Sequence, residues 1–429
     1  FLVRIEDPDR ARSTKELEKN ILDSPHSIGL SSDQRPINQS ERNDIYTSAA
    51  QKILDSNQAY YCECSVERLE KMRSDQQANG QKPQYDGRCR ELKLEKLEKR
   101  VLRLKTPLEG EVILKDFVRG DIVFNNSELD DLIILRGDGT PTYHLCNVVD
   151  DYEQGVTTVI RGEDHTSNTP RQIHIQKALG YPELEYAHLP LVLGEDKKRL
   201  SKRHAATSLE EYQELGYLDS AILNTLARLG WSKGESEVFY LEDLIRDFEI
   251  SEVQKAGAIF DITKLDFLNS QHMANLSLED FKSFLKPFMV KLAIDIDTHP
   301  KIDLLIESMR SSGTTFSSVA SNLQCFFLDV ESYNENAINK FIGDSSEVLT
   351  DLRSKISDTS NWTEESLDSL LLEYREEKNL KIPQVNQPLR IALTGSTNSP
   401  SLGLTMFLFD QSEVVKRIND LIDRIRKES

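Results

Sequence analysis

The sequence has few cysteines, no excess of basic residues and no long apolar run, and each shortage limits what the protein can be. Its five cysteines in 429 residues are an odd number and too sparse for the disulfide framework of a secreted domain, so we expect reduced thiols in a reducing compartment. Its formal net charge of −19 excludes nucleic-acid binding by overall attraction, so any RNA contact must use local clusters of Lys and Arg. No stretch of about 18 apolar residues occurs, which predicts a soluble protein without a membrane span.

The length of the chain predicts several domains, and its first residues predict a strand followed by helices. A chain of 429 residues is too long for one compact core, which predicts two to four domains. Residues 1–5, Phe-Leu-Val-Arg-Ile, read as the middle of a buried strand, so we expect sequence upstream of them to be missing. Helical patterns follow around residues 14–23 and 41–56, and with the strand they indicate a βα unit.

Residues 61–142 differ in character from their flanks and predict an inserted α+β module. They contain a charged, helix-like run at 88–100 and alternating strands such as 101–104 and 133–135. The module begins with a pair of cysteines and a loop rich in Gly and Pro. We therefore expect it to interrupt the fold that begins before it.

A second βα pattern follows the insertion, with a strand at 156–160, a helix at 169–179 and a strand at 188–193. Strand–helix–strand units on both sides of an insertion predict a split parallel sheet. Beyond residue 208 the pattern is helical, apart from an extended run at 389–393. The predicted fold class is α/β, a split Rossmann-like parallel sheet with an α+β insertion, followed by all-α domains.

The pentapeptide at 199–203, Arg-Leu-Ser-Lys-Arg, follows a predicted strand and places cations on a loop. Negative charge builds on the ATP phosphates when a carboxylate attacks the α-phosphorus, and a lysine such as Lys202 can stabilise that charge. A solvated basic loop without a catalytic role is the alternative that the pentapeptide alone leaves open.

Other polar side chains lie where open α/β sheets bind ligands, at the carboxyl ends of strands. Glu6 follows the first strand, and Arg161 and Asp164 follow a later one. Tyr143 and Asn147 are four residues apart and would face the same way on a helix. Arg161 can bind a carboxylate through two parallel hydrogen bonds, which a lysine cannot. Each assignment has a structural alternative. Glu6 could belong to an acidic turn, Tyr143 and Asn147 could be a core or cap pair, and Arg161 and Asp164 could form a surface ion pair.

Cys62, Cys64, Tyr85 and Cys89 form a C-x-C pattern followed by Y-x-x-x-C within the insertion. Thiolates are the protein ligands that zinc prefers, and three of them with a fourth donor can complete a tetrahedral site. Ordinary reduced cysteines are the state we expect, and a zinc site is the alternative.

Residues 88–105 carry eight basic side chains against three acidic ones, a positive stripe on an acidic protein. Such a stripe can contact phosphates of a nucleic acid. A surface helix stabilised by pairs such as Glu95 with Lys99 is an equally open interpretation, and the two are compatible.

Taken together, these segments resemble the glutamyl-tRNA synthetases. The pentapeptide is similar to the Lys-Met-Ser-Lys-Ser signature of class I aminoacyl-tRNA synthetases, in the form that this family uses, although Arg199 replaces the first lysine. The amino-terminal residues resemble the Arg-Ile-Glu-Asp-Thr-Asp segment of the same family. The likeness runs from end to end but is weak between about 280 and 385. It is carried by residues 1–10, 141–151, 159–165, 199–203, 217–232, 389–395 and 413–425.

The resemblance implies roles for individual residues. One set would surround ATP: Asp164 contacts the nucleotide, and the catalytic loop consists of Arg199, Ser201, Lys202 and Arg203. A second set would bind glutamate, with Glu6 on its α-amino group and Arg161 on its distal carboxylate. That second set comprises Arg4, Glu6, Tyr143, Asn147 and Arg161.

The same resemblance implies the activity and the partners. We expect a glutamate–tRNA ligase that works as a monomer with L-glutamate, tRNA(Glu) and ATP, the last accompanied by Mg²⁺. Some relatives carry zinc in the insertion, one with a tyrosine ligand, whereas Glu91 stands where others have histidine. The implied domains are a catalytic domain, an acceptor-binding insertion, a helical stem-contact domain and a helical anticodon-binding domain. Their residues are 1–60 with 143–208, then 61–142, 209–285 and 286–429.

Alternatives to this assignment remain. A catalytically inactive tRNA-binding or regulatory paralogue is one, and a non-discriminating enzyme that also charges tRNA(Gln) is another. The His-Ile-Gly-His-type motif of class I synthetases does not occur in the sequence, and we expect it to lie upstream of residue 1. The composition and the departures from the family signature predict the mitochondrial matrix as the compartment, with the bacterial cytoplasm as the alternative.

Overall fold

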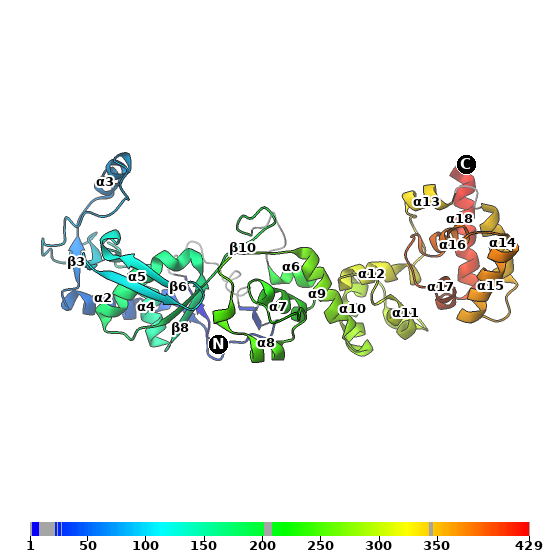
Figure 1. The fold of residues 1–429 in the computed structure, drawn as a ribbon, viewed down its shortest axis with the longest axis horizontal. Coiled ribbons are helices and arrows are strands. Elements are labelled where there is room, and N and C mark those ends of the chain that lie inside the picture. Colours follow the sequence, from blue (N-terminus) through cyan, green and yellow to red (C-terminus); the bar gives the residue numbers. More distant parts are fainter. Residues whose placement is uncertain are drawn as a thin grey trace. The chain divides into compact units, whose positions relative to one another are not determined.

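The computed structural model of the protein forms two compact units. The first unit consists of residues 1–207 and 226–261, and the second of residues 208–225 and 262–429. All strands of the described chain belong to the first unit (Figure 1). The residues that the structure describes are 2–7, 22–23, 25–26, 28–200, 208–342 and 346–428.

The first unit contains three small sheets and one sheet of four strands. Its strands are β1 (Arg4–Ile5), β2 (Ile37–Asn38), β3 (Ala59–Cys62), β4 (Val101–Leu104), β5 (Glu111–Asp116), β6 (Gly120–Asn125), β7 (Ile133–Leu135), β8 (Thr158–Gly162), β9 (Glu185–Leu189), β10 (Val192–Leu193) and β11 (Ala258–Ile259). Its helices are η1 (Gln39–Glu41), α2 (Asn43–Asp55), α3 (Val66–Ala78), η2 (Asn126–Glu128), α4 (Tyr143–Glu153), η3 (Glu163–Asn168), α5 (Thr169–Leu179), α8 (Leu241–Asp247) and η4 (Ile250–Glu252).

The four-stranded sheet has the order β6-β5-β9-β8 and carries Arg161 near the end of β8. Strands β8 and β9 are parallel, with Arg161 opposite His188, and β5 is parallel to β9. Strands β5 and β6 form an antiparallel hairpin. This hairpin lies in the range predicted for the insertion, yet it extends the sheet that follows the insertion. The four-part division of the chain therefore stays a prediction.

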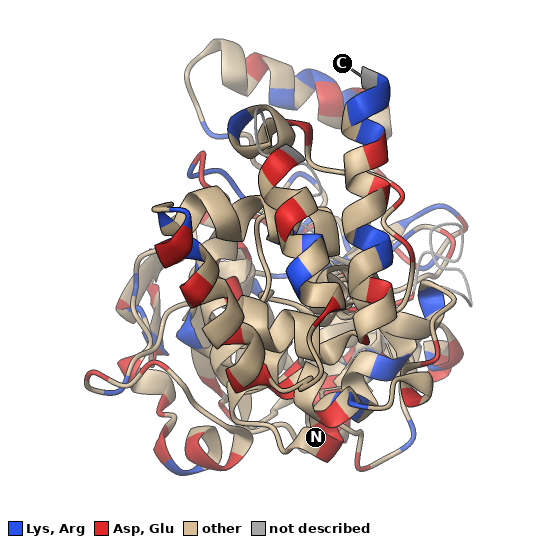
Figure 2. Ribbon diagram, turned by 90° about the vertical axis from the view of Figure 1, so that its right-hand side faces the viewer, with Lys and Arg blue, Asp and Glu red and all other residues tan. Residues whose placement is uncertain are grey.

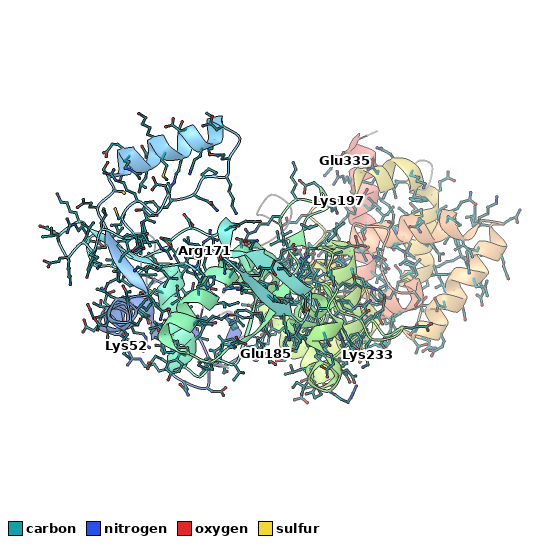
Figure 3. The ribbon with its side chains drawn as sticks, turned by 60° about the vertical axis from the view of Figure 1, so that its left-hand side comes forward. Lys52, Arg171, Glu185, Lys197, Lys233 and Glu335 are labelled. Carbon is teal, nitrogen blue, oxygen red and sulfur yellow. The ribbon has the colours of Figure 1, made fainter. Side chains whose placement is uncertain are left out.

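The core of the first unit lies where α2, α4 and α5 meet the antiparallel sheet β3-β4-β7. Tyr46 on α2, Leu104 on β4 and Leu145 on α4 are buried there. This packing fixes α4, and with it the direction in which the first turn of α4 presents its polar side chains. Helix α3 has no fully buried residue (Figure 3), although Leu69 and Met72 pack against the cluster that contains Tyr60 and Cys62.

Helix α5 has the bounds that the sequence predicts, because both ends carry strong signals. Pro170 occupies the first turn, where its missing N–H costs nothing, and Gly180 ends the helix in the left-handed region at φ 70°. The flanking strands differ more from the prediction. Strand β8 is shifted by two residues, and the predicted strand at 188–193 is divided into β9 and β10 by Pro190.

The second unit is helical, and helix α7 (Asp219–Arg228) spans its boundary with the first unit. Its remaining helices are α6 (Leu209–Glu214), α9 (Ile262–Ala274), α10 (Leu278–Lys291), η5 (Ile296–Thr298), α11 (Ile302–Met309), α12 (Phe316–Leu323), η6 (Gln324–Phe326), α13 (Glu335–Phe341), α14 (Ser346–Ser357), α15 (Glu364–Glu377), α16 (Ile382–Thr394), α17 (Leu402–Leu408) and α18 (Gln411–Glu428). Helix α18 carries both acidic and basic residues along its length (Figure 2) and buries Val414, Ile418 and Leu421.

Two predictions of local structure are wrong. The extended run expected at 389–393 is the last part of α16, and it resembles a strand only because Leu389, Ile391 and Leu393 are all buried. The helix-like run at 88–100 is formed by turns and loops, and Lys99 within it has a φ of 71°. Its leucines do not share one buried face, because Leu92 and Leu97 are 51% and 59% exposed whereas Leu94 packs against the cysteine cluster.

Two other predictions meet the described chain only in part. Of the expected amino-terminal strand, β1 covers two residues, with Ile5 buried and Leu2 exposed. The helix expected at 14–23 falls mainly outside the described residues. No helix within the described chain has both the length and the hydropathy that crossing a bilayer would require.

Candidate functional site

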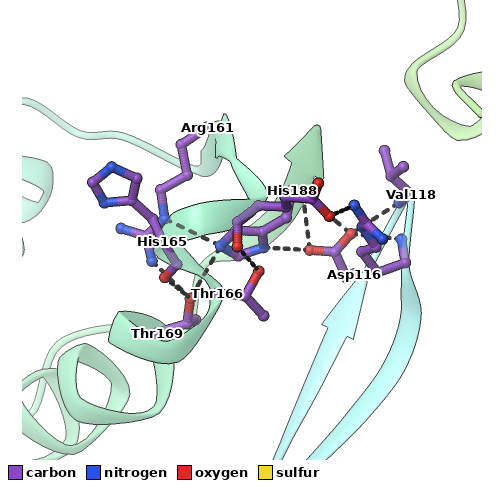
Figure 4. Close-up of polar contacts among 9 residues, drawn as sticks. Asp116, Val118, Arg161, His165, Thr166, Thr169 and His188 are labelled. Carbon is purple, nitrogen blue, oxygen red and sulfur yellow. Dashed lines mark hydrogen bonds and ion pairs between the residues drawn. The ribbon is translucent and has the colours of Figure 1, made fainter. Parts of the chain in front are cut away.

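Arg161 is held at the carboxyl end of β8 by two neighbouring side chains (Figure 4). Its Nε donates to Nε2 of His188 at 3.1 Å, and its Nη2 donates to Oγ1 of Thr169 at 2.7 Å. Thr169 begins α5 and His188 lies on β9, and both are fully buried. No described residue accepts a hydrogen bond from Nη1. One end of the guanidinium is therefore fixed, and the other end is available to a ligand.

Behind Arg161, His188 is paired with Asp116, the last residue of β5. The imidazole Nδ1 lies 2.6 Å from the Asp116 carboxylate, and both side chains are fully buried. Burial alone would raise the pKa of Asp116, but hydrogen bonds from the backbone of Arg119 and from His188 hold it below its ordinary value. Burial lowers the pKa of His188, and the nearby positive charge of Arg161 acts in the same direction.

Tyr143 and Asn147 lie on successive turns at the start of α4. Tyr143 shares a hydrogen bond of 3.1 Å with Nδ1 of His165. Its pKa is raised, chiefly by burial and then by the negative charge of Glu6, against the opposing effects of Arg161 and of a hydrogen bond with Asn147. Among the predicted residues, Asn147 thus hydrogen-bonds to Tyr143, and the charges of Glu6 and Arg161 both act on the Tyr143 hydroxyl.

Arg4 lies on β1, and Glu6 directly follows that strand. Arg4 donates to Asp151 on α4 at 2.8 Å and to Gln154 at 3.1 Å, and its guanidinium lies 3.7 Å from the carboxylate of Glu6. The Glu6 side chain is 40% exposed, whereas that of Arg4 is largely buried. Arg4 thus joins β1 to α4, and Glu6 keeps its carboxylate accessible.

A buried network beneath Asn147 explains its orientation. Nε2 of Gln39 donates to both Oδ1 of Asn147 and Oδ2 of Asp150, each at 3.0 Å. Tyr46 and Arg42 complete the set of donors to Asp150 at 2.7 and 2.9 Å. The side-chain carbonyl of Asn147 is thereby used within the protein, so its amide N–H groups are what remain for Tyr143 and a ligand.

Part of the proposed nucleotide site is also described. Arg199 lies 3.5 Å from Asp164, and the two side chains are 73% and 37% exposed. Arg199 belongs to a short hairpin in which Leu200 donates its backbone N–H to Val192. Ser201, Lys202 and Arg203 lie outside the described residues.

The three cysteines of the insertion and Tyr85 are gathered at one point of the first unit. The sulfurs of Cys62, Cys64 and Cys89 lie within 4.8 Å of one another, with Cys64 and Cys89 3.6 Å apart. The Tyr85 hydroxyl lies 3.4 Å from Cys62 and 3.7 Å from Cys64. No disulfide joins any described cysteine. The four side chains that the sequence pattern selects are thus brought together.

The two neighbouring thiols have opposite pKa shifts. Burial would raise the pKa of Cys62, but hydrogen bonds from Tyr85, the backbone of Cys64 and Arg103 lower it to about 7. Burial and the adjacent thiols raise the pKa of Cys64 to about 11. The lowered pKa of Cys62 favours its thiolate, which is the form of cysteine that binds a metal ion.

Part of the positive stripe at 88–105 is directed inward. Arg90 pairs with the carboxylate of Asp131 at 2.6 Å, and Arg103, 4% exposed, donates to the carbonyl of the same residue at 2.7 Å. Arg100 pairs with Glu63 at 2.6 Å. These arginines stabilise the insertion, so the surface charge of the stripe rests mainly on its lysines.

Comparison with known proteins agrees with this geometry. Residues 1–267 match a family model described as the catalytic domain of class I tRNA synthetases (E and Q), and residues 278–422 match one described as an anticodon binding domain. The chain is 43% identical to glutamate–tRNA ligase 2 of Halorhodospira halophila, with 100% of the chain and 92% of the relative covered. It is 41% identical to glutamate–tRNA ligase of Thermodesulfovibrio yellowstonii, with 99% and 92% covered.

Solved structures give the same result. The crystal structure of a glutamate tRNA ligase from Elizabethkingia meningosepticum, in complex with its amino acid, matches with a TM-score of 0.87 and 29% identity, covering 99% of this chain and 92% of that one. The chain belongs to the glutamate–tRNA ligase family of class I tRNA synthetases. The family resemblance and the fold class predicted from the sequence are therefore confirmed.

Within this glutamate–tRNA ligase fold, the sequence prediction missed the residues that support the site. Asp116, His188 and Thr169 had no role assigned, although they fix Arg161, and Asp151 had none, although it fixes Arg4. One signal was present for His188, a polar residue that begins the strand predicted at 188–193, but no strand was predicted to end at Asp116. Only the pairing of β5 with β9 shows that they meet.

Proposed function

We propose that this chain activates L-glutamate with ATP and transfers the glutamyl group to the 3′ end of tRNA(Glu). The observation that carries the proposal is Arg161, because His188 and Thr169 hold one side of its guanidinium and no described residue takes the other. A planar cation fixed in this way suits the distal carboxylate of glutamate, which it can bind through two parallel hydrogen bonds. The uncharged amide of glutamine would gain less from it.

Glu6 supplies the complementary charge for the α-ammonium group of the amino acid. Arg4, fixed by Asp151, lies 3.7 Å from Glu6 and orients its carboxylate. Tyr143 and Asn147 are proposed to bind the amino acid between these two charges, since the charges of both Glu6 and Arg161 act on the Tyr143 hydroxyl. A cation at one end and an anion at the other match the charges of glutamate in one orientation only, which supports specificity.

The proposed reaction has two steps. In the first, an oxygen of the α-carboxylate of glutamate attacks the α-phosphorus of ATP, and the bond from this phosphorus to the bridging oxygen of the β-phosphate breaks. Pyrophosphate leaves, and glutamyl-adenylate stays bound. In the second, a ribose hydroxyl at the tRNA 3′ end attacks the adenylate carbonyl carbon, loses its proton, and releases AMP. Mg²⁺ enters with ATP as part of that substrate. Neither step requires a protein nucleophile, so the side chains act by positioning and charge stabilisation.

The ATP phosphates are the proposed ligand of the loop that begins at Arg199. Lys202 stabilises the charge that builds on the phosphates, and Ser201 and Arg203 support it there. Asp164 binds the nucleotide, and its closeness to Arg199 at 3.5 Å supports a common location for these two residues. Lys202→Ala should therefore lower the rate of activation more than it raises the KM for glutamate.

The proposed tRNA contacts follow the order of the predicted domains. The insertion at 61–142 contacts the acceptor end, 209–285 the stem and 286–429 the anticodon, with the chain acting as a monomer. The match of residues 278–422 to an anticodon binding domain supports the last of these. Since the net charge is −19, binding depends on local lysines and should weaken steeply with added salt.

The cluster of Cys62, Cys64, Tyr85 and Cys89 fits a structural zinc ion. A tetrahedral site with Zn–S bonds of about 2.3 Å places its sulfurs roughly 3.8 Å apart, and Cys64 and Cys89 are 3.6 Å apart. All four donors come from the insertion, so zinc bound there would brace its loops and take no part in the chemistry. This geometry favours the zinc alternative over ordinary reduced thiols.

The proposed compartment is the bacterial cytoplasm. The relatives reported above come from bacteria, which favours the bacterial cytoplasm over the mitochondrial matrix. Localisation of the tagged full-length protein in its source cells distinguishes the two.

ATP–pyrophosphate exchange by the full-length protein, with and without tRNA, tests the function. Exchange with glutamate, and little with glutamine or aspartate, is the expected result. No exchange under any condition would instead support an inactive tRNA-binding paralogue. Charging of both tRNA(Glu) and tRNA(Gln) with glutamate would identify a non-discriminating enzyme.

A further inference from the structure

Three neighbouring strands of the first unit end in a buried polar chain that leads to Arg161 (Figure 4). Strand β5 ends at Asp116, β9 carries His188 next to its last residue, and β8 carries Arg161 in the same place. Thr169, the first residue of α5, closes the chain with Oγ1 3.1 Å from Nε2 of His188. The carboxylate therefore contacts the imidazole, and the imidazole and the hydroxyl each accept a hydrogen bond from the guanidinium.

The Asp116 carboxylate is well supplied with donors, so it can remain ionised although it is buried. It accepts the backbone N–H groups of Val118 at 3.0 Å, Arg119 at 2.8 Å and His188 at 3.0 Å, besides Nδ1 of His188 at 2.6 Å. An ionised carboxylate without such partners would cost several kcal/mol to bury. Here each oxygen has at least two donors, and the position of the carboxylate is fixed by backbone groups.

The chemistry of the groups then determines which nitrogen of His188 carries the proton. An ionised carboxylate only accepts, so Nδ1 of the neutral ring must donate to Asp116, and Nε2 is left with a lone pair. The Nε–H of Arg161 only donates, and it points at that lone pair from 3.1 Å. With the other tautomer, two N–H groups would face each other. The guanidinium is therefore oriented only while Asp116 selects the tautomer of His188.

We propose that Asp116 is a positioning residue for amino-acid selection, which acts through His188 and Thr169 to aim the free end of Arg161 at the distal carboxylate of glutamate. This inference rests on the proposed role of Arg161. The hairpin β5–β6 lies in the range predicted to bind the tRNA acceptor end. Through Asp116, this hairpin would also take a direct part in the amino-acid site. The turn between β5 and β6 makes a second link to the end of β8. Arg119 of this turn pairs with Glu163, whose carboxylate also accepts the backbone N–H of Leu191 at 3.2 Å.

Asp116→Asn separates the positioning role from simple packing, because it keeps the volume of the side chain. The oxygen of the new amide is needed by the backbone donors of Val118 and Arg119, so its NH₂ group faces Nδ1 of His188. The imidazole must then carry its proton on Nε2, against Arg161. We expect the KM for glutamate to rise at least tenfold, with the KM for ATP changed less than twofold.

Thr169 provides a matched pair that does not disturb the buried carboxylate. Thr169→Val keeps the shape and removes the acceptor for Nη2 of Arg161, so the KM for glutamate should rise about tenfold. Thr169→Ser restores the hydroxyl and should recover most of the loss. Thr158→Val, on the same strand as Arg161 but bonded to the exposed Glu185, is the control and should have no effect. If Asp116→Asn yields no folded protein, the Thr169 pair decides.

The experiment measures KM and kcat for glutamate and for ATP in activation by the full-length protein with tRNA present, with melting temperature as the check on folding. Arg161→Ala is measured alone and combined with Asp116→Asn, and the combination should add nothing to Arg161→Ala. If Arg161→Ala leaves the KM for glutamate unchanged, the proposed site itself is wrong. If Arg161→Ala raises it, but Asp116→Asn and Thr169→Val leave it within twofold of the wild type, the positioning role is overturned while the function stands.

Discussion

Arg161→Lys tests the proposed mode of glutamate recognition most directly, because it keeps the positive charge and changes only its geometry. The guanidinium has five N–H groups, of which two are used by His188 and Thr169 at 3.1 and 2.7 Å. An ammonium group concentrates its three donors on one atom, so it cannot bind both partners and also form two parallel hydrogen bonds to a carboxylate. The variant should therefore keep the ion pair but lose at least one charge-assisted hydrogen bond to glutamate.

The size of the loss follows from the strength of such a bond. One hydrogen bond to a charged group contributes about 1.5–3 kcal/mol, so kcat/KM for glutamate should fall roughly 10- to 150-fold in Arg161→Lys. Arg161→Ala removes both bonds and the charge, and should lower kcat/KM by about two to four orders of magnitude. Because the arginine discriminates by charge, Arg161→Ala should also reduce the preference for glutamate over glutamine.

ATP–pyrophosphate exchange with tRNA present measures both variants, with glutamate and ATP varied in turn. Arg246→Lys is the control, because this arginine of the first unit is 65% exposed and pairs only with acidic neighbours on α8. Its kinetic constants should match those of the wild type. A glutamate KM that is unchanged in Arg161→Lys and Arg161→Ala, or a loss confined to ATP, would show that Arg161 does not bind the amino acid.

Three further predictions concern other parts of the chain. Cys89→Ser should remove bound zinc, measured by elemental analysis of the purified protein, whereas Cys325→Ser should retain it; equal metal content in both would argue against the site. Tyr143→Phe should raise the KM for glutamate several-fold through loss of its hydroxyl, while Tyr152→Phe, on the exposed part of α4, should not; an equal response of both would remove Tyr143 from the site. Ile418→Ala should destabilise the second unit by about 2–5 kcal/mol, measured by chemical unfolding, because Ile418 is fully buried; a loss below 1 kcal/mol would contradict the described packing.

Several residues and helix bounds could be placed from the sequence because short segments carry clear local signals. Arg161 follows a strand and is followed by a charged turn, so its place at a ligand-binding edge could be inferred without tertiary structure. Helix α5 could be delimited because Pro170 and Gly180 mark its ends. Tyr143 and Asn147 could be placed on one face because four residues make about one helical turn.

Two segments were assigned the wrong secondary structure because contacts with the rest of the unit, and not their local pattern, determine their conformation. The run at 389–393 is apolar at nearly every position, which suits a buried strand and a fully buried helix equally well. Residues 88–100 carry the charge pattern of a surface helix, but the loop is fixed by the cluster around Tyr85 and by Arg90 bound to Asp131. Neither outcome depends on the residues of the segment alone.

The sequence by itself determined the chemical groups of the site, the family to which they point and the helical character of the carboxyl-terminal half. Only the tertiary structure decided how Arg161 is aimed, because that depends on Asp116, which is 45 residues away along the chain and reaches His188 through the pairing of β5 with β9. Local patterns fix the elements within one stretch of chain, whereas the partners of a buried polar group are chosen by which strands become neighbours. Which strands become neighbours depends on pairing the buried polar groups of the whole unit, so no single segment specifies the arrangement.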